Sequence, residues 1–319
     1  MPIEIAAHAG FCMGVRRAVE SAVQVADSGV PSCTLGELIH NPTVVDMLRQ
    51  RGIPPVASAE EAAGRQVLIR SHGVAPEVIR QLEKAGCKVV DLTCPFVNKL
   101  HRVVAEDTGE DCPLIMVGER EHPEVKGTCG WARGKVYVVA TAEEAAQLPE
   151  MDQAAAAVQT TFPPERWEAI VAVLRGRVQH LKEHNTICNA TAVRQREAKK
   201  LAAASDAMIV VGGRTSANTH KLFEACKALC PRTILVECAA EIPPAFANIH
   251  SDKIGITAGA STPDGSLEEV ATHMTDNENM AQSSDFTMDA IVATMTRIKA
   301  GQRSEEHTSE LQSHLNLVC

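Results

Sequence analysis

The 319-residue sequence lacks the features that define several common protein classes. It has no apolar run long enough to span a bilayer, and its first ten residues, MPIEIAAHAG, have neither the basic nor the apolar region of a signal peptide. No C-x-x-C pair occurs, which excludes zinc-ribbon and simple ferredoxin spacings. The P-loop and G-x-G-x-x-G patterns are also missing, so a nucleotide is not the expected ligand.

The charge and the cysteine content narrow the class further. A net charge of −9 argues against general binding to nucleic acid or to an anionic membrane, so any anionic ligand needs a local site. Eleven cysteines in a chain without an export signal indicate a reducing compartment, where cysteines are free thiols or metal ligands. We therefore expect a cytoplasmic protein with neither a membrane nor a nucleic acid as its partner.

The sequence alternates short β-rich runs with helical patterns. After Ile3 and Ile5, apolar residues recur from Val15 at the i, i+3, i+4, i+7 spacing of an amphipathic helix. This alternation predicts parallel sheets flanked by helices, but it does not decide between one large sheet, a barrel and several small α/β domains. The further β-rich runs are Val67–Arg70, Lys88–Thr93, Leu114–Gly118, Ala155–Thr161, Met208–Gly213, Thr233–Glu237 and Lys253–Gly259.

Chemically active residues stand directly after many of these runs. In open α/β sheets, ligands bind beyond the carboxyl ends of the strands, where helix N-termini also point. Because the same placement recurs along the chain, it predicts a shared site. The residues so placed are Cys12, His72, Cys94, His122, Thr160, Thr161, Ser216, Asn218 and Ser261.

The cysteines fall into two groups. Cys226 and Cys230 fit the inner face of a helix and are expected to be small buried hydrophobes. Cys12, Cys94 and Cys188 each lie at a turn before a helical pattern, a position that lowers thiol pKa and suits thiolate ligands. Taken singly, each fits a structural role as well as a functional one. Together, three thiolates at a common centre would leave a fourth metal position open.

The histidines indicate an anion pocket of neutral donors. His40, His72 and His122 each sit by a glycine, proline or asparagine turn, although a lone histidine is more often structural than a ligand. Glu124, two residues after His122, is a candidate proton donor if it is buried, or else a first-turn carboxylate favoured by the helix dipole. Arg16 and Arg17 are expected on a solvated helix face.

A set of motifs in a fixed order carries a family resemblance. The chain resembles the 4-hydroxy-3-methylbut-2-enyl diphosphate reductases, which catalyse the last step of the non-mevalonate isoprenoid pathway. The resemblance covers about residues 1–278, and the motifs are specific in combination. They are GFCMGVRRA, ELIHNPTVV, IRSHGV, DLTCPFVNKLH, EHPEVKGT, QTTF, TICNAT followed by RQ, and AGAST followed by PD.

The resemblance implies three small α/β domains, with mainly parallel sheets, arranged like a trefoil around a central iron–sulfur cluster. The expected limits are residues 12–94 for the first domain, 95–187 for the second, and 188–278 together with 1–11 for the third. Cys12, Cys94 and Cys188 match the family's cluster ligands. They would hold a [4Fe-4S] cluster with one iron that the protein does not ligate.

The resemblance also assigns the substrate site. His40, His72, Ser216, Asn218 and Ser261 match the diphosphate-binding residues, and His122 matches a further substrate-site histidine. Glu124 matches the proton-delivering carboxylate, and Thr160 matches the hydroxyl in its relay. One departure is visible, because Ala217 stands where the family often has a second serine. The flanking donors remain, so binding is expected to survive.

The implied reaction is the reductive dehydroxylation of (E)-4-hydroxy-3-methylbut-2-enyl diphosphate to isopentenyl and dimethylallyl diphosphate. Its partners would be this allylic diphosphate and an electron donor such as ferredoxin or flavodoxin. One alternative is a redox-inactive hydratase that uses the open iron as a Lewis acid. A second alternative is a thiol-rich iron or redox sensor, which would not need the histidine and serine pocket.

The C-terminal region needs separate treatment. Residues 279–302 resemble the linker that precedes S1 RNA-binding repeats in some family members, so such repeats could follow in the complete protein. Residues 303–319 include RSEEHTSELQSH, the in-frame translation of a common sequencing adapter. We interpret this stretch as an assembly artefact and expect the natural C-terminus to be missing.

Overall fold

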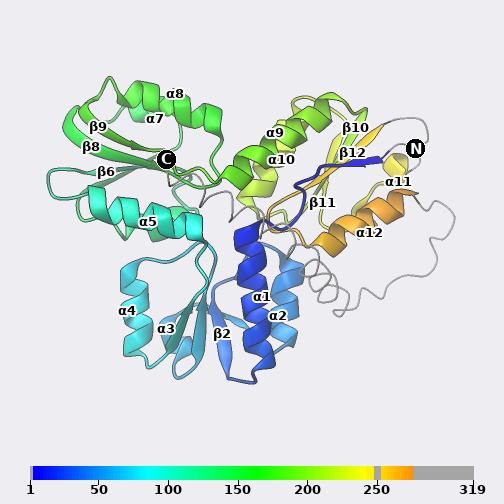
Figure 1. Cartoon of the computed structure of the whole chain (residues 1–319), viewed down its shortest axis with the longest axis horizontal. Helices are drawn as coiled ribbons and strands as arrows, with labels where there is room; N and C mark the ends of the chain where they lie inside the picture. Colours follow the sequence, from blue (N-terminus) through cyan, green and yellow to red (C-terminus); the bar gives the residue numbers. More distant parts are fainter. Residues whose placement is uncertain (1–2, 248–252, 276–319) are drawn as a thin grey trace, which may run out of the picture.

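The computed structural model describes residues 3–247 and 253–275. Its strands form three separate four-stranded parallel sheets, so neither one large sheet nor a barrel is present in this part of the chain. Each sheet and its helices form one lobe, and the three lobes meet at the middle of the molecule (Figure 1). The predicted trefoil of three parallel α/β units is confirmed.

The first unit packs helices on both faces of its sheet. Ala18, Val19, Ala22 and Val23 form the buried stripe of α1 that the sequence spacing predicts, and they share a core with Leu68 of the sheet. Its sheet runs β3 (Pro55–Val56), β2 (Ser32–Leu35), β4 (Gln66–Ile69), β5 (Lys88–Asp91). Its helices are α1 (Met13–Asp27), α2 (Pro42–Gln50), α3 (Ala59–Ala62) and α4 (Pro76–Lys84).

The second unit repeats this three-layer arrangement. Ile115 and Val117 face the core under α7 and α8, whereas Leu114 and Met116 face the core under α5 and α6, as period-two alternation in a strand requires. Its sheet runs β7 (Val136–Val139), β6 (Leu114–Val117), β8 (Met151–Val158), β9 (Val178–His184). Its helices are α5 (Pro95–Asp107), α6 (Pro123–Cys129), α7 (Ala142–Ala146) and α8 (Pro164–Leu174).

The third unit takes its edge strand from the beginning of the chain. Ile3 to Ile5 pair in parallel with Ile254 to Ile256, so β1 closes a sheet whose other strands come some 200 residues later. The sheet runs β11 (Thr233–Val236), β10 (Ala207–Val211), β12 (Ile254–Ala258), β1 (Ile3–Ile5). Its helices are α9 (Asn189–Ala203), α10 (Ala217–Lys227), a 3₁₀ turn (Ala239–Glu241), α11 (Pro244–Ala247) and α12 (Asp264–Thr275).

All three sheets have the same strand order: second, first, third, fourth. In the first unit this order is β3-β2-β4-β5, in the second β7-β6-β8-β9, and in the third β11-β10-β12-β1. The fourth strand of each unit leads directly into the first helix of the next one, and Cys12, Cys94 and Cys188 lie in these three connections. The cysteines therefore mark the junctions between the units.

The seven β-rich runs listed from the sequence correspond to β4, β5, β6, β8, β10, β11 and β12 within a few residues. Strands β2, β3, β7 and β9 have no counterpart among these runs. Strand β9, with the sequence VQHLKEH, is mostly polar because it is an edge strand with exposed side chains. No helix in the described ranges is both long and apolar enough to cross a bilayer.

The proposed domain limits remain a prediction, which the pairing of β1 with β12 supports. Residues 276–278 of the third domain lie outside the described residues, as do the predicted linker, 279–302, and the predicted artefact, 303–319.

Candidate active site

The three predicted ligand cysteines line one cavity with about 690 Å³ of empty space. Each is the N-cap residue of a long helix: Cys12 of α1, Cys94 of α5 and Cys188 of α9. The positive ends of three helix dipoles therefore converge on this cavity, which favours negative charge there.

The same backbone hydrogen bond holds each cysteine. The Cys94 N–H donates to the carbonyl of Ser71 (3.0 Å), the Cys188 N–H to that of Thr160 (2.9 Å), and the Cys12 N–H to that of Ala260 (3.2 Å). Each acceptor follows the third strand of a sheet, and each donor follows the fourth. The three thiols thus occupy equivalent positions around the junction of the units.

Burial affects the pKa values of two of the thiols more strongly than the helix N-termini do. Desolvation raises the pKa of Cys94 to about 11, helped by repulsion from Cys12 and Cys188 and opposed by the nearby backbone N–H groups of Phe96 and Val97. Desolvation likewise raises the pKa of Cys188. The expectation of lowered thiol pKa values is therefore wrong at these two positions. Three half-buried thiolates around one cavity repel one another and would be stabilised by a cationic centre among them.

Gly14, which sequence reasoning left without a role, packs against one of these thiols. A Cβ added at Gly14 would lie 2.5 Å from the Cys94 Sγ and 3.3 Å from its Cβ. The first turn of α1 must therefore carry glycine so that the cysteine of the next junction can lie against it. In the sequence, the glycine of the CMG motif is the feature that could have indicated this close contact.

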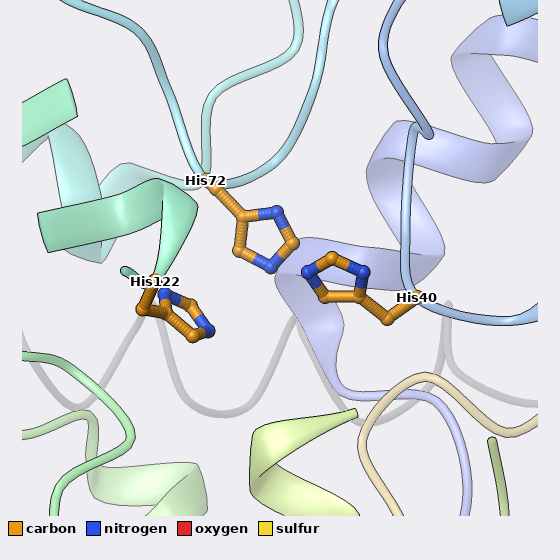
Figure 2. A group of neighbouring side chains, drawn as sticks. All are labelled: His40, His72 and His122. Carbon is orange, nitrogen blue, oxygen red and sulfur yellow. The ribbon is translucent and has the colours of Figure 1, made fainter. Parts of the chain in front are cut away.

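His40, His72 and His122 face one another from three loops (Figure 2). The His40 and His72 ring centroids are 4.8 Å apart, and the His122 ring meets the other two edge-on at 6.1 and 5.4 Å. In the described part of the chain, this is the only group of three such side chains whose ligand atoms, all within 4.8 Å of one another, could hold a single ion. The three cysteines do not form such a group, so their shared cavity suits a larger centre.

The hydrogen bonding of His122 favours an anion over a metal ion among the histidines. The Nδ1 of His122 accepts a hydrogen bond from the Glu124 N–H at 3.2 Å, so the neutral ring carries its proton on Nε2 and donates from there. Desolvation lowers the pKa of His122 to about 4, and desolvation and the neighbouring histidines lower that of His72 well below the usual value. Uncharged rings that can take up protons are suited to a multiply charged anion.

The third unit adds hydroxyl and amide groups next to His40 in the same cavity. The Ser261 Oγ donates to the His40 carbonyl at 3.3 Å and lies 3.5 Å from the Ser216 Oγ. The Nδ2 of Asn218 is buried and has no hydrogen-bond partner among the described residues, so a donor is free for a ligand. Ser216, Asn218 and Ser261 line the cavity, whereas Ala217 does not.

Glu124 and Thr160 form a buried pair on the cavity wall. Glu124 is only 1% exposed, and its two carboxylate oxygens accept hydrogen bonds from the Thr160 N–H (2.6 Å) and the Thr160 hydroxyl (2.7 Å). Desolvation raises the pKa of Glu124, although both hydrogen bonds oppose it. The candidate proton donor is therefore buried rather than a solvated first-turn carboxylate.

The structure brings all eleven predicted site residues together. Ten of them line the cavity, and the His122 ring contacts those of His40 and His72. Thr161, which the sequence analysis placed after a strand without a role, lines it too, as does Arg194, which lies in the TICNATAVRQ motif. The roles of these residues remain predictions that the structure itself does not test.

Two remaining sequence predictions can be judged. Cys226 and Cys230 are buried, as expected. Arg17 is exposed, but Arg16 is not on a solvated face: its side chain is 18% exposed and forms an ion pair with Asp264 at 2.9 Å. This pair links α1 of the first unit to α12 of the third, a tertiary contact that helical periodicity alone does not reveal.

Together, the fold and the site define a class of three-unit α/β proteins in which three cysteines meet imidazole, hydroxyl and carboxyl groups at one central cavity. The model of the LytB protein family matches residues 3–275. The chain belongs to this family, as the motif resemblance predicts.

Named relatives agree with this assignment. A 4-hydroxy-3-methylbut-2-enyl diphosphate reductase from Geobacter sp. (strain M21) is 44% identical over 271 residues, which cover 85% of this chain and 95% of the relative. The reductase of the same name from Aquifex aeolicus (strain VF5) is 42% identical over 277 residues, with the same coverage.

Solved structures share the fold. One, described as (E)-4-hydroxy-3-methyl-but-2-enyl diphosphate reductase, the terminal enzyme of the non-mevalonate pathway, is 41% identical, with a TM-score of 0.66, and covers 86% of this chain and 100% of that one. A Plasmodium falciparum reductase structure, 22% identical with a TM-score of 0.79, covers 93% of this chain and 99% of its own and supports the fold alone.

Proposed function

We propose that this protein is the terminal reductase of the non-mevalonate (MEP/DOXP) isoprenoid pathway. It converts (E)-4-hydroxy-3-methylbut-2-enyl diphosphate to isopentenyl diphosphate and dimethylallyl diphosphate. Two electrons and two protons enter, the allylic C–O bond breaks, a C–H bond forms, and the oxygen leaves as water. The observation that carries the proposal is the single cavity in which three equivalently placed cysteines meet an anion-binding wall and a buried carboxyl–hydroxyl pair.

The cysteines fit a [4Fe-4S] cluster with one iron that the protein does not ligate. They supply three thiols at one cavity, their spacing does not suit a single ion, and each cysteine is followed by the N-terminus of a long helix. The positive end of each helix dipole would stabilise a cluster thiolate at that position. When bound, the cluster would supply the two electrons and a Lewis-acidic iron.

The histidine and serine wall fits the diphosphate. His122 donates from Nε2, Asn218 offers a free N–H, and the Ser216 hydroxyl lies beside that of Ser261. Donors on three units would fix both phosphates and so hold the allylic alcohol in one orientation. Binding energy from the remote diphosphate then supports the positioning of the reacting carbon.

Glu124 and Thr160 fit the delivery of a proton to the departing oxygen. Because burial raises the pKa of Glu124, its carboxyl keeps a proton to higher pH than an exposed glutamate does. The Thr160 N–H occupies Oε1, so a protonated Oε2 can donate to the Thr160 hydroxyl. The hydroxyl hydrogen is then free to point into the cavity and donate to the substrate.

Two further features of the proposal concern the cell. The reaction needs a one-electron donor protein, and ferredoxin and flavodoxin both meet that requirement. A cytoplasmic location suits a chain whose cysteines must stay reduced to bind iron.

The test is anaerobic iron–sulfur reconstitution followed by an assay with a dithionite–viologen donor. We expect about four irons per chain, a broad cluster absorbance and donor-dependent consumption of the allylic diphosphate. Cys112→Ser is the matched control for Cys12→Ser, because Cys112 is also half-buried but lies outside the cavity. A reconstituted protein without a cluster, or one that turns over substrate equally well without the donor, would contradict the proposal.

A further inference from the structure

Helix α9 carries a buried charge where its two counterparts carry apolar side chains. Arg194 lies six residues after Cys188, and the residues six positions after Cys12 and Cys94 are Ala18 and Leu100. Arg194 is 4% exposed, and the other two are fully buried. Since the equivalent helices pack with apolar residues here, the fold does not require a charge. Burying a guanidinium costs free energy, so a compensating interaction is expected.

Arg194 reaches across to the segment that carries Cys12. Its Nη2 donates to the Gly10 carbonyl at 2.7 Å, and Gly10 lies two residues before Cys12. Gly10 has a φ of +89°, and a Cβ there would lie 2.8 Å from Asp264 Oδ1, so this turn has little freedom to move. The guanidinium Nε is buried and has no hydrogen-bond partner among the described residues. Arg194 thus anchors the backbone before Cys12 and keeps a buried, unpaired N–H while lining the cavity.

Arg194 brings a positive charge to the cavity that the thiols line. Among the residues that line the cavity in the described part of the chain, Arg194 is the only arginine or lysine. Desolvation lowers its pKa, and its largest opposing influences are Cys12 and Cys188, ahead of Glu197. Glu197 is itself engaged by the ring of His8 at 2.7 Å.

We propose that Arg194 is a positioning residue that fixes the Cys12 segment and supplies the permanent positive charge beside the three-thiol centre, which raises the reduction potential of that centre. The inference rests on the proposed function, because it presumes the iron–sulfur cluster. Adding an electron makes the centre more negative, and a buried fixed cation stabilises the reduced form more than the oxidised form.

The test compares anaerobically reconstituted wild type, Arg194→Gln and Arg194→Lys by spectroelectrochemical titration, with iron and sulfide counted on the same samples. Glutamine keeps a donor for the Gly10 carbonyl but removes the charge. At a fixed applied potential, we expect the ratio of reduced to oxidised cluster in the glutamine variant to fall about tenfold, which is 59 mV for a one-electron couple. The lysine variant should stay close to the wild type.

Arg17→Gln is the matched control. The Nη2 of Arg17 also donates to a backbone carbonyl beside a ligand cysteine, that of Thr93 at 2.7 Å, but Arg17 is exposed. Solvent screens an exposed charge, so this variant should keep the wild-type potential. An equal shift in the Arg17 variant would show that backbone anchoring, not the buried charge, sets the potential, and would overturn the inference.

The other outcomes are equally decisive. A fully loaded Arg194→Gln protein with the wild-type potential overturns the inference, and weaker binding of inorganic diphosphate in that protein would reassign Arg194 to the substrate. If the glutamine variant cannot hold a cluster, a loaded lysine variant with the wild-type potential supports the role of charge, whereas loss of the cluster from both overturns it. A wild-type protein without a cluster contradicts the proposed function instead.

Discussion

Two sets of loop residues differ in how uniform they are between the three units. One set follows the fourth strands, and the other follows the first and third strands. After the fourth strand, every unit has a cysteine: Cys94, Cys188 and, because β1 is the fourth strand of the third unit, Cys12. After the first and third strands, the side chains differ between units. The first two units supply three imidazoles, a threonine hydroxyl and a carboxyl, and the third supplies serines and an asparagine.

The difference reflects two separate requirements of the site, one from the metal centre and one from the substrate. A centre held on the axis of three similar units needs the same ligand from each, so the cysteine positions are uniform. An elongated substrate with a charged end and a reacting end needs different groups on different sides. The positions after the first and third strands differ between the units, so together they supply both anion donors and the Glu124–Thr160 pair and can orient the substrate.

The largest effect is expected from replacing one of the three cysteines that follow the fourth strands. Cys12→Ser, Cys94→Ser and Cys188→Ser should each abolish turnover and remove the cluster absorbance, because each removes one of three equivalent ligands. Iron content and ultraviolet–visible spectra after anaerobic reconstitution measure this. If one serine variant keeps full iron and activity, the equivalence of the three junctions is wrong.

The next largest effect should come from the carboxyl on the asymmetric wall. Glu124→Gln should lower kcat by about 10² to 10⁴, the range for a general acid, while substrate binding persists. Because burial raises the pKa of Glu124 and the protonated form is the donor, wild-type kcat should fall as pH rises through that raised pKa. A pH–kcat profile measures this limb. If it stays unchanged in Glu124→Gln, another group delivers the proton.

The histidines should couple binding to proton uptake. Desolvation and the neighbouring histidines hold the pKa of free His72 well below its usual value, and its Nδ1 has no hydrogen-bond partner among the described residues. A bound diphosphate will raise that pKa, so a proton enters the site when the anion binds near neutral pH. Calorimetry in two buffers of different ionisation enthalpy measures this uptake. His72→Asn should reduce it and weaken binding by about 1.5–3 kcal/mol, the usual value of a hydrogen bond to a charged group. Equal binding enthalpies in both buffers would contradict this.

A smaller effect tests how closely the units meet. Gly14→Ala places a methyl group 2.5 Å from the Cys94 sulfur, so one of the two must shift. We expect slower reconstitution and a lower iron content than in the wild type, with the fold retained by circular dichroism. Gly29→Ala is a control for cluster loading, because a Cβ at Gly29 meets nothing within 4 Å, although its φ of +70° carries a backbone cost. Equal iron content in both variants would rule out the steric account.

The smallest effect is expected at Ala217. Restoring the second serine adds a hydroxyl at a position that does not line the cavity, so diphosphate affinity should change less than about threefold, that is by well under 1 kcal/mol. Isothermal titration with inorganic diphosphate measures it. A tenfold gain would mean that Ala217 faces the ligand in the bound state.

Much of this architecture can be predicted from the sequence, for identifiable reasons. Buried strands such as β6 and β10 are continuous apolar runs, which the sequence shows directly. Cys12, His72 and Ser261 can be recognised as site candidates because each of them closely follows such a run. The family resemblance supplied the trefoil, which alternation alone left open. Polar β9 could not be recognised, because an edge strand with exposed side chains has no apolar signature.

Contacts between the units could not be predicted from the sequence. The ion pair of Arg16 with Asp264 and the hydrogen bond of Arg194 to Gly10 join residues 248 and 184 positions apart. The raised thiol pKa values also depend on burial at a three-way junction, whereas the local helix N-terminus predicts the opposite direction. The local sequence pattern thus identifies the site residues, whereas tertiary packing determines their contacts and their pKa values.

Mössbauer spectroscopy of the protein reconstituted with ⁵⁷Fe tests the central claim most directly, namely that three equivalent cysteines hold one cluster with an open iron. The account predicts a four-iron cluster in which one iron is distinct from the other three, and in which the allylic diphosphate changes the signal of that iron alone. Four indistinguishable irons that do not respond to the substrate, or a two-iron centre, would contradict it.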